Sequence, residues 1–187
     1  SAHAPDPSAI YTGAMAVSQI LGRMMFAGAA LVGLLPLSVA RWLGAASGRI
    51  AHALGTREAK VARRNLELIA PELDASAREA LVGEILRATG RNLLETLRVW
   101  THKRRSNLRL VRAVHGVELL DEALADGRGL IVSAPHYGNW ELLIEYLASR
   151  APFSLVYRVP EKAAGDVFLR LARGGPNVRL VPAETNA

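Results

Sequence analysis

The chain has 187 residues, a length that suits one domain with a core of its own. Its 23 Lys and Arg exceed its 17 Asp and Glu, which gives a formal net charge of +6, and nearly all of the positive charge is arginine, whose planar fork suits phosphate and carboxylate groups. The chain has no cysteine, so the sequence excludes disulfides, thiolate metal sites and a cysteine acyl-enzyme.

The first part of the sequence is a short polar stretch followed by a long apolar segment. Residues 1–8, SAHAPDPS, are predicted to be a disordered or processed end without information on the fold. The apolar segment covers residues 9–46, and its centre is free of charge between Arg23 and Arg41. Because a bilayer core needs about 20 apolar residues in a helix, we predict a membrane-associated helix here.

A buried helical hairpin, broken at Pro36, is the alternative interpretation of the apolar segment. A signal peptide fits less well, because the segment begins some way from the start of the chain. Arg41, Arg49 and Arg57 follow the segment and Asp6 precedes it, so the positive-inside rule places the body of the protein on the cytoplasmic side.

Residues 47–187 are predicted to form one domain, which begins with two helices. The stretch REAKVARRNLELIA, residues 57–70, has apolar positions at helical spacing. Ser76 and Glu79 form a capping-box signature, which predicts that the second, longer helix begins there. Gly90 is a weak point within this helix.

The stretch THKRRSNLRLVR, residues 101–112, has the densest positive charge in the chain. It is a candidate site for anionic headgroups or an acidic protein partner, and a solvated helix end, where cations meet the C-terminal dipole, is the simpler alternative. Nucleic acid is not predicted as a partner, because aromatic side chains are not interleaved with the arginines as a stacking surface needs. The candidate patch consists of Lys103, Arg104, Arg105 and Arg109.

The pattern changes after residue 116 to alternating strands and helices. Strand, helix, strand, helix and strand in this order predict an α/β fold with a parallel βαβαβ sheet. Ligands bind such sheets at the carboxyl ends of the strands, and His136 follows the first predicted strand. The predicted strands are residues 130–133, 153–158 and 178–181, and the predicted helices are residues 139–149 and 166–173.

His136 and Glu141 are the candidate catalytic pair. On one continuous helix they would lie roughly 140° apart, so they can meet only if a helix begins between them. Gly138 permits an unusual backbone angle and Asn139 is a preferred N-cap, which predicts such a beginning, with backbone amides free to hold an oxyanion or phosphate. A histidine that is hydrogen-bonded to a carboxylate through one ring nitrogen can use the other as a general base on a hydroxyl.

His136 has other interpretations, as a structural histidine or as part of a serine hydrolase or metal site. Local loop hydrogen bonds would make it a structural histidine. The sequence has no G-x-S-x-G elbow, which disfavours a serine hydrolase, and no H-E-x-x-H motif or nearby third ligand, so no metal site is predicted.

The stretch PHYGNWELL, residues 135–143, resembles the H-x-x-x-x-[DE] motif of the glycerolipid and lysophospholipid acyltransferase superfamily. In its H-[FY]-G-N-W-E form it most resembles the lipid A biosynthesis late acyltransferases, the lauroyl and myristoyl transferases. ARRNLELIAPEL and VYRVPEKAAGDVFLRLAR resemble further parts of that family. The resemblance implies an acyltransferase domain that is incomplete here, because members continue beyond the third predicted strand.

The resemblance also implies roles for individual residues. His136 would be the general base and Glu141 its partner. Arg158 would bind substrate charge or steady Glu141, and Arg173 falls where the family has a second arginine. The residues that the resemblance implies in substrate binding are Arg158, Arg173, Gly138 and Asn139.

The implied acyl donor is an acyl carrier protein thioester, and the implied acceptor is a hydroxyl of a lipid A precursor, a phosphorylated glucosamine disaccharide. Direct transfer would need no cofactor. The implied location is the bacterial inner membrane, with the catalytic part on the cytoplasmic face. The alternatives are a truncated, non-catalytic protein that binds lipid or scaffolds a membrane, and an acyltransferase that acts on another lysophospholipid or glycolipid.

Overall fold

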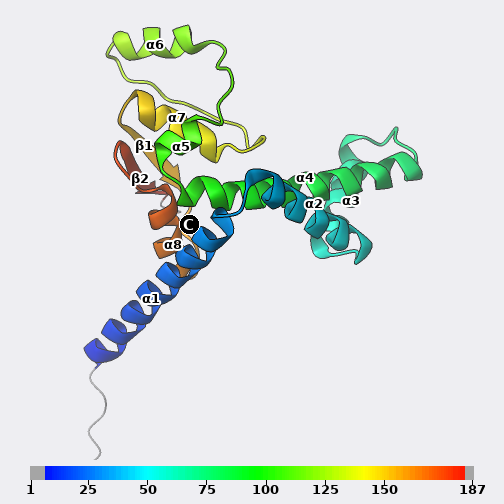
Figure 1. The fold of residues 1–187 in the computed structure, drawn as a ribbon, viewed down its shortest axis with the longest axis horizontal. Coiled ribbons are helices and arrows are strands. Elements are labelled where there is room, and N and C mark those ends of the chain that lie inside the picture. Colours follow the sequence, from blue (N-terminus) through cyan, green and yellow to red (C-terminus); the bar gives the residue numbers. More distant parts are fainter. Residues whose placement is uncertain (1–6, 184–187) are drawn as a thin grey trace, which may run out of the picture.

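The computed structural model describes the backbone of residues 7–183 and the side chains of residues 15–183 (Figure 1). The predicted end over residues 1–8 therefore lies mostly outside the described residues. Helices dominate the described part of the chain, which also has one small parallel sheet. The elements are α1 Pro7–Gly33, α2 Leu37–Ala53, α3 Arg57–Ile69, α4 Ala75–Thr101, α5 Arg104–Leu108, α6 Val117–Ala125, α7 Glu141–Arg150, β1 Phe153–Tyr157, α8 Ala163–Arg173 and β2 Val178–Pro182.

The apolar segment predicted as one helix over residues 9–46 forms two helices, α1 and α2. The break falls just before α2, at Pro36, because proline has no amide hydrogen to donate and its ring obstructs the preceding turn. The alternative of a hairpin broken at Pro36 located this break correctly, but α1 is mostly exposed. Its first part extends away from the rest of the chain, and its carboxyl-terminal part packs against α8 and α4 (Figure 1).

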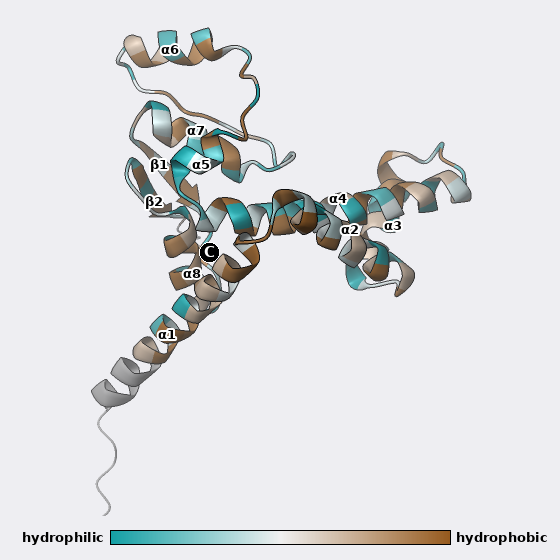
Figure 2. Cartoon of the chain, viewed as in Figure 1, coloured by the Kyte–Doolittle hydropathy of each residue, from teal (hydrophilic) through white to brown (hydrophobic). Residues whose placement is uncertain are grey.

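Helix α1 has the length and composition of a membrane-spanning helix. Its segment Met15–Gly33 is long and apolar enough to cross a bilayer, and 11% of it is buried (Figure 2). Its carboxyl-terminal end is fixed to the body by Arg98 of α4, which donates to the carbonyl oxygens of Gly33 and Leu35 at 3.0 and 3.2 Å. Membrane association of α1 stays a prediction.

Two aromatic contacts hold α1 and α4 against α8. The ring of Phe168 on α8 lies 6.3 Å from that of Phe26 on α1 and 5.4 Å from that of Trp100 on α4. These contacts place α8, and the residues at its end, beside the long helix α4.

Helices α2 and α4 pack at very short range. A Cβ atom at Gly44 of α2 would collide with the backbone of Gly90 of α4, and one at Gly48 would collide with the backbone of Leu86. Gly90 was expected to weaken α4, but the helix runs through it without a break. The missing side chain at Gly90 lets the backbone of α2 approach that of α4 closely.

Helix α3 has the predicted extent, and it packs on α4 through a small core of Ala59, Leu66, Val82 and Leu86. The predicted capping box at the start of α4 is wrong. Asp74 is the N-cap, and its side chain accepts a hydrogen bond from the amide of Ala77 at 2.7 Å.

Glu79 joins α4 to α3 and α2 instead of capping its own helix. Arg63 donates to both carboxylate oxygens, at 2.7 and 2.6 Å, and the Nε2 atom of His52 lies 2.6 Å from one of them. The hydrogen bonds from Arg63 and, to a smaller extent, from His52 lower the pKa of Glu79 from 4.5 to about 2.

We expect the substitution Glu79→Gln to destabilise the chain at neutral pH but not in strong acid. A carboxyl whose pKa is lower in the folded state stabilises that state above its unfolded pKa of 4.5, and the contribution is lost as the pH falls towards 2. Urea unfolding of both forms between pH 7 and pH 2 measures this. A difference that stays constant over that range would contradict the ionic role of Glu79.

The sheet consists of β1 and β2, which are parallel and pair from Phe153 with Val178 to Tyr157 with Pro182. Helix α8 connects them, so the second half of the predicted βαβαβ unit is confirmed. The predicted strand at residues 130–133 is wrong: these residues are irregular and exposed, Ile131 by 95%. An apolar run forms a buried strand only beside a partner strand and under cover, and in the described structure this run has neither.

Two short helices were not predicted. Helix α5 lies within the basic stretch and is held to α4 by the buried Asn107, whose Nδ2 atom donates to the carbonyl oxygen of Val99 at 2.8 Å. Helix α6 has no buried residues, and an ion pair between its Asp121 and Arg150 at the end of α7 links it to the rest of the structure (Figure 1).

Candidate functional site

The loop that carries His136 turns sharply into α7. Gly138 has a φ of +60°, in the left-handed region, so the chain reverses there and α7 begins at Glu141. The prediction that a helix begins between His136 and Glu141 is confirmed. Asn139 is not the N-cap, which is Trp140, and the Oδ1 atom of Asn139 is buried without a hydrogen bond in the described structure.

The first-turn amides of α7 are partly used within the turn. The amide of Leu142 donates to the carbonyl oxygen of Asn139 at 3.1 Å, and that of Leu143 donates to Trp140 at 3.0 Å. The predicted role of free helix amides in holding an oxyanion gains no support from these two groups.

Glu141 is buried and forms an ion pair with Arg173, the last residue of α8. The side chains are 4% and 13% exposed. The Nε atom of Arg173 lies 3.1 and 3.2 Å from the two carboxylate oxygens, and its second terminal nitrogen lies 2.5 Å from Oε1. The ion pair places the carboxylate of Glu141 at the start of α7, where the helix dipole favours negative charge.

Two tryptophan rings enclose the guanidinium of Arg173. Its Cζ atom lies 4.7 Å from the ring centre of Trp140 and 5.7 Å from that of Trp100. Cation–π attraction and exclusion of water both hold the arginine in place. The position of Glu141 is therefore determined by residues from α4, α7 and α8.

His136 is exposed and contacts the other side of this cluster. Its ring lies edge-on to Trp140, with 5.1 Å between ring centres. The structure pairs Glu141 with Arg173 rather than with His136, and no hydrogen bond joins His136 to Glu141 among the described residues. Trp140 thus contacts both the imidazole and the arginine that holds the carboxylate.

Arg158 follows β1, and its side chain is exposed, without an ion pair in the described part of the chain. The function of steadying Glu141, predicted for Arg158, belongs to Arg173. The substrate-binding role of Arg158 stays a prediction.

Tyr157, the last residue of β1, connects the sheet to α8. Its hydroxyl donates to Oδ1 of Asp166 at 2.6 Å, and Arg170 donates to Oδ2 at 2.7 Å. Burial raises the pKa of Asp166, but these two hydrogen bonds outweigh it and the pKa lies below its usual value. This cluster fixes the start of α8 and therefore supports the position of Arg173.

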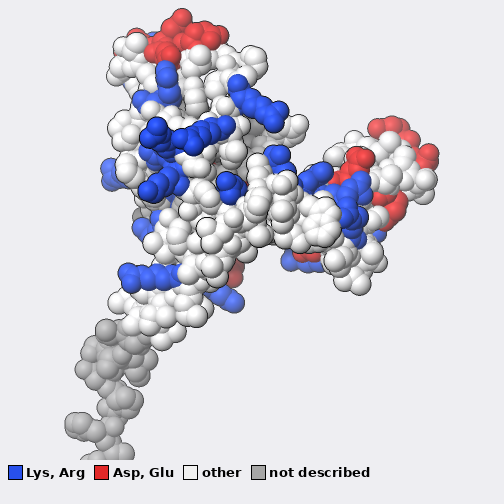
Figure 3. All heavy atoms as spheres, in the orientation of Figure 1, with Lys and Arg blue, Asp and Glu red and all other residues white. Residues whose placement is uncertain are grey.

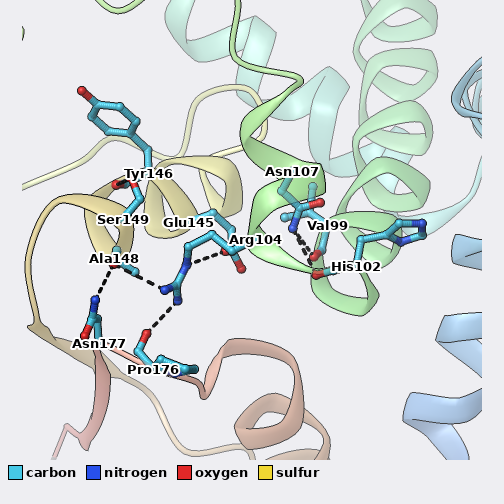
Figure 4. A network of polar contacts seen from close by, with 10 residues as sticks. All are labelled: Val99, His102, Arg104, Asn107, Glu145, Tyr146, Ala148, Ser149, Pro176 and Asn177. Carbon is cyan, nitrogen blue, oxygen red and sulfur yellow. Dashed lines mark hydrogen bonds and ion pairs between the residues drawn. The ribbon is translucent and has the colours of Figure 1, made fainter.

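Arg104, predicted as part of a headgroup or partner patch, also cross-links elements within the structure (Figure 4), and its role in the patch stays a prediction. It donates to Glu145 of α7 at 3.0 Å and to the carbonyl oxygen of Pro176 at 2.8 Å. Burial raises the pKa of Glu145 in spite of this partner. The other three residues of the predicted patch, Lys103, Arg105 and Arg109, are exposed, and positive charge gathers on this face of the molecule (Figure 3).

A groove of about 550 Å³ lies between α4 and the loop that carries His136. Arg41 of α2 donates from Nε to Glu95 of α4 at 2.6 Å within it. This groove could not be predicted from the sequence, because no local signal indicates which loop lies over which face of α4. Its lining residues are Arg41, Ala88, Thr89, Arg91, Asn92, Glu95, His136, Gly138 and Asn139.

Residues 15–186 match the sequence model of the family described as "Bacterial lipid A biosynthesis acyltransferase". The chain belongs to this family. The match covers His136, Glu141 and Arg173 together, so the cluster around Trp140 lies within the part of the chain that the lipid A acyltransferase family shares.

Curated relatives include three transferases with different names. The chain is 32% identical over 124 residues to the lipid A biosynthesis palmitoleoyltransferase of Escherichia coli strain K12, which covers 66% of this chain and 40% of the relative. It is 31% identical over 128 residues to the lipid A biosynthesis lauroyltransferase of the same strain, covering 68% and 42%. It is 34% identical over 89 residues to a phosphatidylinositol mannoside acyltransferase of Mycobacterium tuberculosis, covering 47% and 28%. The chain thus spans well under half the length of these relatives.

Proposed function

We propose that this protein transfers a fatty acyl chain from an acyl carrier protein thioester to a hydroxyl of a lipid A precursor, with His136 as the general base. The observation that carries the proposal is the arrangement at the start of α7. The exposed imidazole of His136 precedes a helix whose first residue, Glu141, is a buried carboxylate paired with the largely buried Arg173. Membership of the lipid A acyltransferase family supports the same chemistry.

In the proposed reaction a ring nitrogen of His136 removes the proton from the acceptor hydroxyl as its oxygen attacks the thioester carbonyl. A carbon–oxygen bond forms and the carbon–sulfur bond breaks. The carrier's thiolate leaves and takes the proton from the imidazolium. Each proton and electron pair is accounted for by the two substrates and His136, and no acyl-enzyme is needed.

Glu141 would act through its charge on the imidazolium that forms at His136. Among the described residues its Oε2 atom accepts the 3.2 Å contact from Arg173 alone, so it has capacity for a further hydrogen bond. Rotation of the exposed His136 side chain beside Trp140 would bring a ring N–H to this oxygen when substrate is bound. Arg173 is then a positioning residue, because it fixes the carboxylate without touching the reacting atoms.

The acceptor has a second candidate class. The name of the mycobacterial relative specifies a phosphatidylinositol mannoside, a glycolipid built on a different core, so another glycolipid is the alternative acceptor. The helix α1 and the exposed arginines that follow it favour an acceptor held in a membrane, with the catalytic part on the cytoplasmic face.

The test uses the full-length gene product that contains this sequence. It is incubated with acyl carrier protein that bears a labelled acyl chain, and either a lipid A precursor or a phosphatidylinositol mannoside is offered as acceptor. Mass spectrometry of the lipid products identifies the acylated species. Acylated lipid A precursor is the expected product, and release of free fatty acid alone would refute the proposed transfer.

A further inference from the structure

The groove between α4 and the His136 loop has the composition of a subsite for an anionic group. Two arginines and one glutamate line it, which leaves one positive charge when His136 is neutral. Neutral hydrogen-bonding side chains, Thr89, Asn92 and Asn139, line it as well. His136, the proposed general base, belongs to the same lining, so a ligand bound here would lie next to the reacting hydroxyl.

Arg91 carries the free positive charge of this groove. It is exposed, and it has no ion pair with the residues that the structure describes. Arg41, in contrast, is engaged by Glu95 through its Nε atom, and its side chain is 51% exposed. Only Nε of Arg41 takes part in that contact, so its terminal nitrogens can still donate to a ligand.

The groove lies near apolar surface that suits a ligand with hydrocarbon chains. Trp42, the neighbour of Arg41 on α2, is 63% exposed, although it does not line the groove itself. The groove also lies close to the junction of α1 with the body, because Glu95 is one turn from Arg98, which holds the end of α1. An amphiphile with a phosphate group and hydrocarbon chains matches these features better than a soluble anion does.

We infer that Arg91, assisted by Arg41, binds a phosphate group of the lipid acceptor in this groove and thereby orients the acceptor hydroxyl toward His136. This inference rests on the proposed acyl transfer. A guanidinium suits the assignment because it offers planar, paired donors to phosphate oxygens. Glu95 limits the strength of binding, since it neutralises Arg41.

Steady-state kinetics of the full-length gene product test the assignment. Arg91→Gln is expected to raise the KM for a phosphorylated acceptor about tenfold, because a charge-assisted hydrogen bond is lost. The KM for acyl carrier protein and kcat should stay within about twofold of the wild type. With the same acceptor after enzymatic removal of its phosphates, the variant and the wild type should have equal KM values.

Two further variants sharpen the result. Arg64→Gln is the matched control, because Arg64 is an exposed arginine of α3 that pairs only with Glu67 and does not line the groove. It should leave the KM for the acceptor unchanged. Glu95→Gln frees the guanidinium of Arg41, so it should lower the KM for the phosphorylated acceptor severalfold. A rise in the KM for acyl carrier protein with Arg91→Gln would show that the groove binds the donor and would overturn the assignment.

A binding measurement on the full-length gene product separates this inference from the proposed activity. Tryptophan fluorescence is followed during titration with monododecyl phosphate, and dodecyl maltoside serves as the uncharged probe. The wild type and Arg64→Gln should prefer the phosphate, and Arg91→Gln should lose that preference even if no acyl transfer is detected. Equal preference in Arg91→Gln and Arg64→Gln would refute the subsite, whereas absence of transfer by the wild type would refute the proposed function alone.

Discussion

Replacing His136 with alanine is expected to lower acyl transfer by the full-length gene product about 100-fold or more, because general-base catalysis typically contributes that much. The fold should not change. His136 is exposed, and its described contact is the edge of the Trp140 ring, so the free energy of unfolding should stay within about 0.5 kcal/mol of the wild type. Turnover with labelled acyl carrier protein and urea unfolding of the same preparation measure the two effects.

His115→Ala is the matched control for this substitution. His115 is an exposed histidine that precedes α6 and lies outside the groove, so its loss should leave turnover unchanged. Near-normal turnover of His136→Ala would remove the imidazole from the mechanism. Equal losses in both histidine variants would indicate a general effect on the preparation and would equally contradict a specific role for His136.

The parts of the fold that the sequence predicted are those that depend on local signals. Apolar positions at helical spacing located α3, α4 and α8 to within a few residues, and the β1 and β2 segments were recognisable as short apolar runs. The run at 130–133 has the same local appearance as β1, but a strand also needs a partner, and the sequence does not show whether one is present. The capping box failed for a similar reason, because Glu79 has stronger partners on other helices.

The candidate site shows the same division between local and distant information. Gly138 has the backbone angle that its residue type allows, so the turn ahead of α7 was predictable. The partner of Glu141 was not, because Arg173 lies 32 residues further along the chain and its selection over Arg158 depends on how α8 packs against α4. The groove was not predictable from local signals either, because its lining residues come from α2, α4 and the His136 loop, which are far apart in the sequence.

The second large effect is expected at the buried pair of Arg173 and Glu141. Arg173→Met keeps most of the side-chain volume but leaves the Glu141 carboxylate buried without its partner, which should cost about 3 kcal/mol or more of unfolding free energy. Glu141→Gln should cost less, because the amide oxygen still accepts from the guanidinium and Arg173 also contacts two aromatic rings. The double variant removes the uncompensated charge, so it should be more stable than Arg173→Met alone. Urea unfolding of the four forms gives the coupling energy.

The catalytic readout distinguishes a positioning role of Arg173 from a purely structural one. Arg173→Lys retains the charge but loses the planar, two-point contact with Glu141, so the carboxylate would be held less firmly beside His136. We expect a lower kcat with KM values for both substrates close to the wild type, measured at a temperature where the variant is fully folded. An unchanged kcat in a stably folded Arg173→Lys would restrict Arg173 to stability. Glu141 is 4% exposed and does not line the groove that contains His136, so in the proposed mechanism its charge acts on the imidazolium of His136, and the kcat of Arg173→Lys tests that role.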